Sequence, residues 1–138
     1  MKLVYEVEKD GYSLYKAHQN DAGCDLSAAE DFRLEAGVIT SVSTGLRVLI
    51  PSGYVGLILP RSGLSSQGVT VATGVIDPGF TGVLKVAMSV LAGERSFAKR
   101  ARIAQLVIMP IASLELHESS VKDFKSERGN NGFGSSGI

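Results

Sequence analysis

Gly45-Leu46-Arg47-Val48-Leu49-Ile50-Pro51-Ser52-Gly53-Tyr54-Val55-Gly56-Leu57-Ile58-Leu59 contains two short apolar runs on either side of a turn. Within Pro51-Ser52-Gly53, the proline presets its own φ and the glycine tolerates a positive φ, so the chain can reverse direction there. Short runs rich in Val, Ile and Leu that end at such turns are typical of β-strands. The stretch therefore predicts two strands joined by a tight turn.

The same pattern extends over the rest of the chain. Gly, Pro, Ser or Asp interrupts the apolar runs every eight to twelve residues or so, and no long amphipathic helical pattern is visible. This spacing predicts an all-β sandwich or barrel. The expected strands are Lys2–Val7, Gly23–Ala28, Gly37–Ser43, Gly45–Ile50, Tyr54–Leu59, Val69–Val71, Gly82–Val90, Arg102–Pro110 and Leu114–His117.

Length, charge and cysteine content narrow the class of protein. The 138 residues, 44% of them hydrophobic, are enough for one domain with a buried core. The 14 basic and 14 acidic residues cancel, so we expect neither a nucleic-acid nor a membrane partner. Cys24 is the only cysteine, and the start of the chain lacks the apolar run of a signal peptide. We therefore expect a soluble protein of a reducing compartment, the cytoplasm.

Asp77 stands out because it is the only carboxylate between Glu35 and Glu94, and it follows an apolar run. A lone acid in that setting suits a general base that deprotonates water. The alternative is that Asp77 opens a type I turn through Pro78-Gly79 and caps it with its side chain. Composition alone favours the turn.

Two other segments carry polar groups next to predicted strands. Arg61-Ser62-Gly63 offers a guanidinium, a hydroxyl and a closely approachable backbone, which are the parts of a phosphate site, although an ordinary strand-to-turn junction would look the same. Gln105 interrupts the apolar run that begins at Arg102. It faces either a polar site or solvent, and alternation with its neighbours favours solvent.

The chain ends in Ser126–Ile138, which contains four glycines and little apolar content. We expect residues 1–125 to form the domain and residues 126–138 to form a flexible arm. The arm could order over a nucleotide, with Phe133 stacking on a base and Arg128 and the serines meeting phosphates. A disordered tail is the alternative.

Five segments of this sequence, in order, closely resemble the five motifs of the trimeric dUTPase family. They extend over nearly the whole chain, from residue 22 to residue 137. The segments are Ala22-Gly23-Cys24-Asp25-Leu26-Ser27-Ala28, Pro60-Arg61-Ser62-Gly63-Leu64, Gly74-Val75-Ile76-Asp77-Pro78-Gly79-Phe80-Thr81-Gly82, Arg102-Ile103-Ala104-Gln105-Leu106 and Arg128-Gly129-Asn130-Asn131-Gly132-Phe133-Gly134-Ser135-Ser136-Gly137.

This resemblance implies a distorted jelly-roll β-sandwich of the β-clip type and a homotrimer. Each active site would lie between subunits and be closed by the Gly-rich arm of a neighbour. The implied reaction is hydrolysis of dUTP to dUMP and pyrophosphate, which limits uracil incorporation into DNA and supplies dUMP for dTMP synthesis.

The resemblance also implies roles for individual residues. Asp77 would activate the attacking water, and Mg²⁺ would be held mainly by the triphosphate, with Asp25 in a supporting position. The residues expected to bind phosphate are Arg61, Ser62, Gly63, Gln105, Arg128, Ser135 and Ser136. The residues expected to bind uracil and deoxyribose are Val71, Gly74, Val75, Ile76, Phe80 and Phe133.

Two alternatives accompany this reading. Phe80 replaces the tyrosine that most members of the family place beneath the sugar, and Pro78-Gly79-Phe80 also resembles dCTP deaminases of the same fold. Those enzymes need a glutamate in the following strand, where this chain has Val86-Ala87-Met88, so deamination is disfavoured. A regulatory binding protein without hydrolysis is the other alternative, although the catalytic residues are all present.

Overall fold

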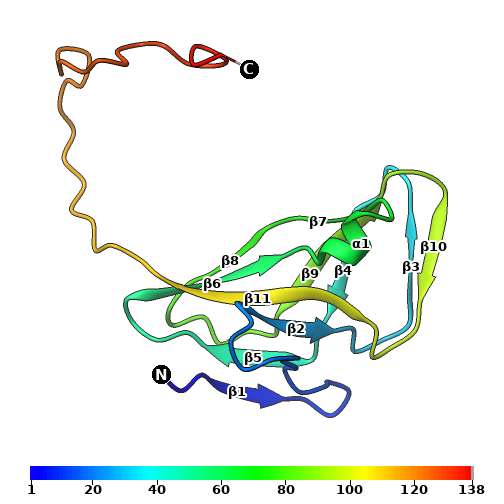
Figure 1. The fold of residues 1–138 in the computed structure, drawn as a ribbon. Helices are drawn as coiled ribbons and strands as arrows, with labels where there is room; N and C mark the ends of the chain where they lie inside the picture. Colours follow the sequence, from blue (N-terminus) through cyan, green and yellow to red (C-terminus); the bar gives the residue numbers. More distant parts are fainter. Residues whose placement is uncertain (138) are drawn as a thin grey trace.

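The computed structural model describes residues 1–137, and its two largest sheets are antiparallel. In the four-stranded sheet the order is β2 (Gly23–Ser27), β11 (Arg102–Pro110), β6 (Tyr54–Leu59) and β8 (Gly74–Ile76). In the three-stranded sheet it is β4 (Thr40–Ser43), β9 (Lys85–Val90) and β7 (Val69–Val71). Two smaller antiparallel pairs join β1 (Val4–Val7) to β5 (Leu46–Leu49) and β3 (Phe32–Glu35) to β10 (Glu94–Phe97). The single helix, α1 (Ser62–Ser65), follows β6 (Figure 1).

One apolar core is formed by residues from both large sheets. Strand β9 shows the alternation that puts one face inside, since Val86 and Met88 are buried while Lys85 is exposed. Ile58 of β6 and Leu106 of β11 meet the same core from the four-stranded sheet. Each such side chain contributes about 1.5–3 kcal/mol when it is removed from water. The core thus holds the two sheets face to face.

A β-bulge in β11 changes which residues face inward. The register against β2 shifts between Arg102 and Ala104, so Ile103 and Ala104 are both buried although they are consecutive. After the bulge, Leu106 points inward and Gln105 points to the opposite face. The bulge therefore directs Gln105 away from the core.

The all-β prediction is confirmed, and most of the expected strands are present. The strand expected at Leu114–His117 is wrong, because those residues are exposed and lie in no strand. Strands β3 and β10 were not predicted because charged residues interrupt them, and the short strand β8 was not predicted either. Arg33 of β3 forms one ion pair with Glu94 of β10 and another with Glu35 of its own strand. The opposite charges therefore offset each other within this strand pair.

Beyond Pro110 the chain leaves the body. Residues 111–137 are exposed, lie in no strand or helix, and extend away from the sheets (Figure 1). The extended segment is thus longer than the glycine-rich stretch that begins at Ser126. No helix within residues 1–137 is long and apolar enough to cross a membrane.

Candidate functional site

Three of the predicted segments meet in one open pocket of about 420 Å³. Strand β2 supplies Asp25, the end of β6 and the start of α1 supply Arg61, Ser62 and Gly63, and β11 supplies Gln105. These strands are neighbours in the sheet because β11 pairs with β2 on one side and with β6 on the other. The sheet order therefore brings together residues that are up to 80 positions apart in the sequence.

Asp25 connects the two arginines of this pocket. Its Oδ1 lies 2.9 Å from Arg61 Nε, and its Oδ2 lies 3.2 Å from the nearest guanidinium nitrogen of Arg102. Arg61 also donates to the carbonyl oxygen of Arg102 at 3.0 Å. Because the Asp25 side chain is only 18% exposed, water screens these contacts less than it would on an open surface. Asp25 thus holds the Arg61 guanidinium in a fixed orientation at the pocket.

Gln105 is fixed by a similar local arrangement. Its Nε2 donates to the Pro60 carbonyl oxygen at 2.9 Å, directly before Arg61. Its Oε1 lies over Gly23, where an added Cβ atom would come within 2.3 Å of it. The half-buried Gln105 faces outward, as alternation favoured, but it lines the polar pocket rather than open solvent.

Ser62 and Gly63 begin the single turn of α1. Arg61 precedes them in extended conformation, with φ −96° and ψ 132°, and its carbonyl oxygen accepts from Leu64 and Ser65. The first N–H groups of a helical turn have no acceptor within that turn, so they remain available to a ligand. An added Cβ atom at Gly63 would meet nothing within 4 Å, so packing within this chain does not require glycine there.

Asp77 opens a turn, but the turn and the role of the side chain differ from the prediction. Phe80 N donates to the Asp77 carbonyl oxygen at 3.3 Å, and Gly79 has a φ of 87°. A positive φ at the third position, after proline, defines a type II turn, so the type I prediction is wrong. The exposed Asp77 carboxylate makes no hydrogen bond or ion pair with residues 1–137. It is therefore free to act on a water molecule.

The segment expected to bind uracil crosses between sheets. Val71 ends β7, which pairs with β9, and Gly74 begins β8, which pairs with β6. The two strands lie in different sheets and do not pair with each other. Val75 is 61% exposed on β8 and Ile76 is half-buried. Phe80 is 44% exposed, and its ring lies against Gly82, where an added Cβ atom would come within 2.5 Å of Phe80 Cζ.

Asp77 and Arg61 lie near opposite ends of β6. Ile76 pairs with Gly56, which places Asp77 beside Val55, six positions before Arg61. At about 3.3 Å per residue, this separates the two Cα atoms by about 20 Å. Asp77 and Phe80 accordingly do not line the pocket that contains Arg61. One copy of the chain does not bring the predicted catalytic residue to the predicted phosphate-binding residues.

The arm residues also lie away from this pocket. Arg128 Nε donates to the Asn131 carbonyl oxygen at 2.9 Å, which closes a local turn. Phe133 is fully exposed, and Ser135 and Ser136 are exposed as well. None of these four residues lines the pocket, and the segment that carries them runs apart from the strands in Figure 1.

Arg102 and Tyr15 are among the pocket residues that had no role predicted from the sequence. Arg102 was quoted within a motif without a role, yet it shares Asp25 with Arg61. Tyr15 also lines the pocket, and its ring lies 5.1 Å from the Arg102 guanidinium carbon. An arginine at the start of an otherwise apolar strand was the available signal for Arg102. No sequence signal marked Tyr15.

A metal site made by protein side chains alone is absent from the part of the chain that the structure describes. No group of three His, Cys, Asp or Glu residues gathers there. Mg²⁺ commonly binds through one or two carboxylates together with substrate phosphates and water. The donor set around Asp25 fits a metal ion that arrives with a phosphate ligand.

Known proteins resemble this chain along nearly its whole length. A family profile described as dUTPase matches residues 10–137. A deoxyuridine 5'-triphosphate nucleotidohydrolase from Solibacter usitatus is 44% identical over 122 residues, covering 85% of this chain and 81% of the relative. The dUTPase of Staphylococcus bacteriophage 80alpha, solved with dUPNHPP, is 33% identical, with a TM-score of 0.93 and 99% coverage of both chains. A variant of the dUTPase from phage phi11 of S. aureus, solved to show the coordination of a structural Mg(II) ion, is 28% identical with a TM-score of 0.83, covering 90% of this chain and 100% of that one.

Proposed function

The chain belongs to the dUTPase family, and we propose that it hydrolyses dUTP to dUMP and pyrophosphate. The observation that carries this function is the convergence of Asp25, Arg61, Ser62, Gly63 and Gln105 in one pocket. A fixed guanidinium, a hydroxyl, an amide and free backbone N–H groups match the oxygens of a triphosphate in both charge and hydrogen-bonding capacity.

In the proposed reaction a water oxygen attacks the α-phosphorus. Asp77 orients this water and takes its proton, while the bond between the α-phosphorus and the oxygen that leads to the β-phosphorus breaks. Pyrophosphate leaves with that oxygen. Arg61 and Gln105 hold the oxygens on which negative charge accumulates, and the ion pair with Asp25 keeps Arg61 in place beforehand.

Mg²⁺ is part of the proposed function, and the triphosphate would hold it. The ion would neutralise charge on the phosphate oxygens, and Asp25, one of the two carboxylates that line the pocket, would support its water shell. Uracil would be bound by main-chain groups of Val71, Gly74, Val75 and Ile76. Phe80 would pack beneath the deoxyribose, where a flat ring leaves no room for a 2′-hydroxyl.

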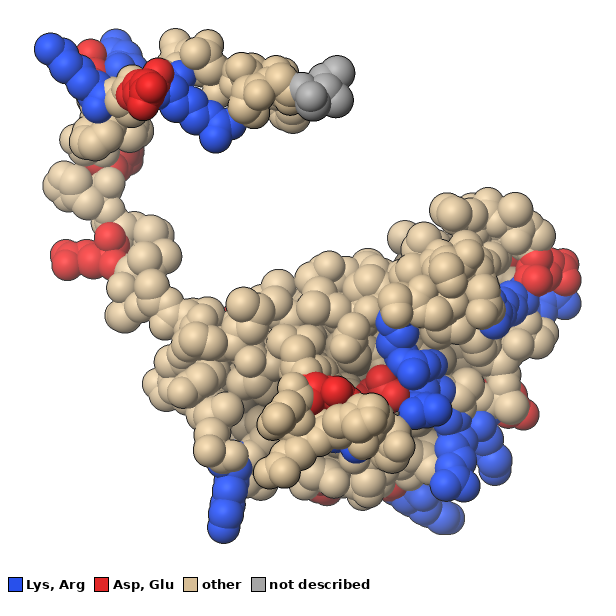
Figure 2. Space-filling model, in the orientation of Figure 1, with Lys and Arg blue, Asp and Glu red and all other residues tan. Residues whose placement is uncertain are grey.

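The active site would be shared between copies in a homotrimer. The separation of Asp77 from Arg61 along β6 supports this, because a second copy can supply what one copy cannot. The extended segment of residues 111–137 supports it as well, since Leu114, Leu116 and Phe133 in it are 77%, 91% and 112% exposed within one chain. Large apolar side chains that find no cover within their own chain indicate a partner surface. The upper surface of the body in Figure 2 carries almost no charge, which suits an interface between copies.

We place the enzyme in the cytoplasm. The free thiol of Cys24 is compatible with the reducing conditions of that compartment.

The reaction is tested by measuring pyrophosphate and ammonia release in parallel from dUTP, dCTP, dTTP and UTP with Mg²⁺. We expect pyrophosphate from dUTP alone. Ammonia from dCTP would instead indicate a deaminase, although β9 carries no carboxylate between Lys85 and Val90. Release of neither pyrophosphate nor ammonia from any of the four nucleotides would favour a binding role.

The shared site is tested by complementation between two inactive variants. Asp77→Asn lacks the base, and a chain that ends at residue 127 lacks the arm. If base and arm come from different copies, co-refolding the two variants restores a fraction of the activity. The matched control is co-refolding the truncated chain with a chain that carries both changes, which restores none. Equal results in both mixtures would contradict a shared site.

A further inference from the structure

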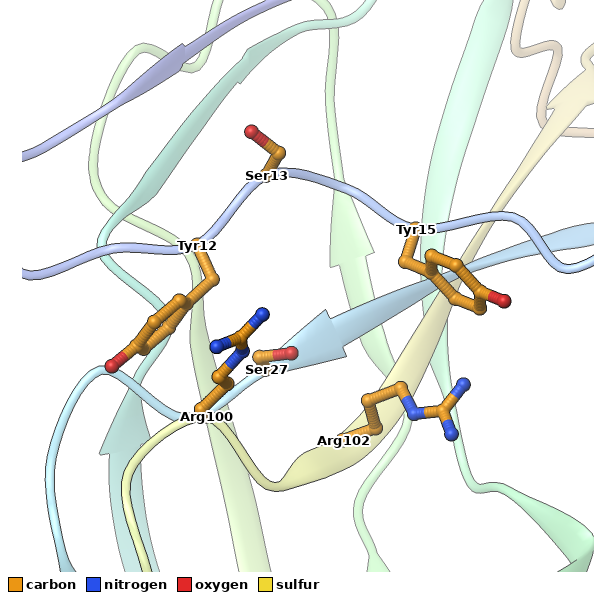
Figure 3. Close-up of a pocket in the computed structure, with 6 residues that line it drawn as sticks. All are labelled: Tyr12, Ser13, Tyr15, Ser27, Arg100 and Arg102. Carbon is orange, nitrogen blue, oxygen red and sulfur yellow. The ribbon is translucent and has the colours of Figure 1, made fainter.

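A second cavity of about 520 Å³ lies beside the phosphate pocket and shares two residues with it, Tyr15 and Arg102. Its other lining residues are Tyr12, Ser13, Ser27 and Arg100 (Figure 3). None of the six is acidic, whereas Asp21 and Asp25 line the phosphate pocket. Tyr12, Ser13, Tyr15 and Arg100 belong to none of the five segments that resemble the dUTPase motifs, so the proposed hydrolysis leaves this cavity without a role.

Two arginine–tyrosine stacks frame the cavity. The Arg100 guanidinium carbon lies 5.7 Å from the centre of the Tyr12 ring, and that of Arg102 lies 5.1 Å from the centre of the Tyr15 ring. Figure 3 shows each guanidinium beside the ring of its tyrosine. A guanidinium whose face lies over a ring keeps the N–H groups on its edge available for hydrogen bonds. Asp25 already accepts from the Arg102 guanidinium at 3.2 Å, whereas the Arg100 guanidinium makes no hydrogen bond within residues 1–137.

Arg100 has an unusual backbone. With a φ of 73° it is the only residue other than glycine that has a positive φ within residues 1–137. The conformation is fixed by a hydrogen bond from Arg100 N to the Ala28 carbonyl oxygen at 2.8 Å. Glycine or asparagine would adopt this conformation at lower cost, and strained residues of this kind cluster at ligand sites. The position thus carries a long cationic side chain despite the strain.

The charge of Arg100 is also uncompensated. Arg100 makes no ion pair with residues 1–137, whereas Arg33, Arg47, Arg61 and Arg102 each have a carboxylate partner. The Ser27 side chain at the floor of the cavity belongs to a residue that is only 6% exposed. The Arg100 guanidinium and the Ser27 hydroxyl thus offer hydrogen-bond donors to a ligand, and none of the six lining residues carries a carboxylate that would repel an anion.

We propose that this cavity is a second anion site that binds the phosphate groups of an oligophosphate. Arg100 provides the principal contact through its guanidinium edge, Arg102 lies between the two pockets, and the Ser13 and Ser27 hydroxyls complete the donor set. The oligophosphate is either free pyrophosphate or the phosphate chain of a second nucleotide. Both carry closely spaced oxyanions, which match paired arginines.

The test is isothermal titration of the full chain with inorganic pyrophosphate, after the first pocket has been filled with a non-hydrolysable α,β-imido analogue of dUTP. We expect saturable binding of one equivalent per chain. Arg100→Asn should weaken it by roughly tenfold or more, because a hydrogen bond to a charged group contributes that much. Asparagine tolerates a positive φ, so this variant removes the charge without adding backbone strain. Arg100→Lys should retain part of the affinity.

Arg33→Ala is the matched control, since it removes one exposed positive charge from β3 without touching the cavity. ATP is titrated in the same way as pyrophosphate. Equal weakening of binding by Arg33→Ala and Arg100→Asn would overturn the proposal. It would also be overturned if neither pyrophosphate nor ATP bound to the filled enzyme. Binding of ATP without pyrophosphate would identify a nucleotide as the source of the phosphates, and binding of pyrophosphate would identify the free anion. The titration does not require an active enzyme. The Arg61→Ala variant, titrated without the dUTP analogue, should therefore also show pyrophosphate binding that depends on Arg100.

Discussion

Gly23 and Gln105 are in such close contact that any side chain at position 23 would occupy the place of the Gln105 amide oxygen. The two residues are diagonal neighbours on β2 and β11, since Gly23 pairs with Val107 and Asp25 pairs with Gln105. Glycine at position 23 is therefore required by the geometry of the phosphate pocket rather than by a turn.

Gly23→Ala is expected to lower kcat/KM for dUTP by roughly tenfold, because displaced Gln105 loses its bond to Pro60 and its place beside the phosphates. The clash involves the flexible end of a side chain, so the melting temperature should change little. Steady-state kinetics of a double-mutant cycle with Gln105→Ala provide the check. If Gly23→Ala still impairs an enzyme that already lacks Gln105, the effect does not pass through that side chain.

Asp77→Asn is expected to lower kcat by about 10²–10⁴-fold and to leave nucleotide affinity nearly unchanged. The folded state should be as stable as before, since the carboxylate has no partner within residues 1–137. Single-turnover kinetics, analogue binding and thermal unfolding measure the three quantities. Asp10→Asn, on an exposed loop, is the control. Loss of binding in Asp77→Asn would make Asp77 a positioning residue.

Removal of residues 128–138 is expected to abolish most turnover while the melting temperature and the far-ultraviolet circular dichroism stay unchanged. The reason is that residues 126–137 are exposed and run apart from the strands of their own chain. Phe133→Ala should reproduce part of the loss through a raised KM, because base stacking contributes to binding. A truncated enzyme with full turnover would remove the arm from the active site.

Gly82→Ala is expected to weaken discrimination against UTP. An added methyl group would push the Phe80 ring from its place against residue 82, and the space that excludes a 2′-hydroxyl would open. The ratio of kcat/KM for dUTP to that for UTP measures this, and we expect it to fall by roughly tenfold. Phe80→Leu is the comparison, since it removes the flat ring directly. An unchanged ratio in both variants would show that another residue selects the sugar.

The sequence predicted those elements whose signals are local. Tyr54–Leu59 and Arg102–Pro110 are largely apolar runs, and both are strands with the predicted bounds. Strand β3 could not be predicted in this way, because Arg33 finds its partner Glu94 only when two distant segments pair. The strand expected at Leu114–His117 has the right composition, but these residues pair with no strand of their own chain within residues 1–137.

The candidate site was predictable to a similar extent. Residue types identified Arg61 and Gln105 as candidates, and the resemblance to a family assigned them roles. The orientation of Gln105 depends on the bulge at the start of β11, and the bulge cannot be read from alternation. The type II turn after Asp77 depends on the φ of Gly79, which the dipeptide Pro78-Gly79 allows but does not determine.

The placement of Arg61 and Asp77 at opposite ends of β6 has a genetic consequence if the active site is shared as proposed. Each copy then contributes a phosphate pocket to one site and a base to another. A copy with a defective Asp77 would therefore impair a site whose phosphate pocket is intact, inside an otherwise normal assembly. Mutant alleles of this kind are expected to act dominantly when they are expressed beside the wild type, whereas alleles that prevent folding are expected to be recessive.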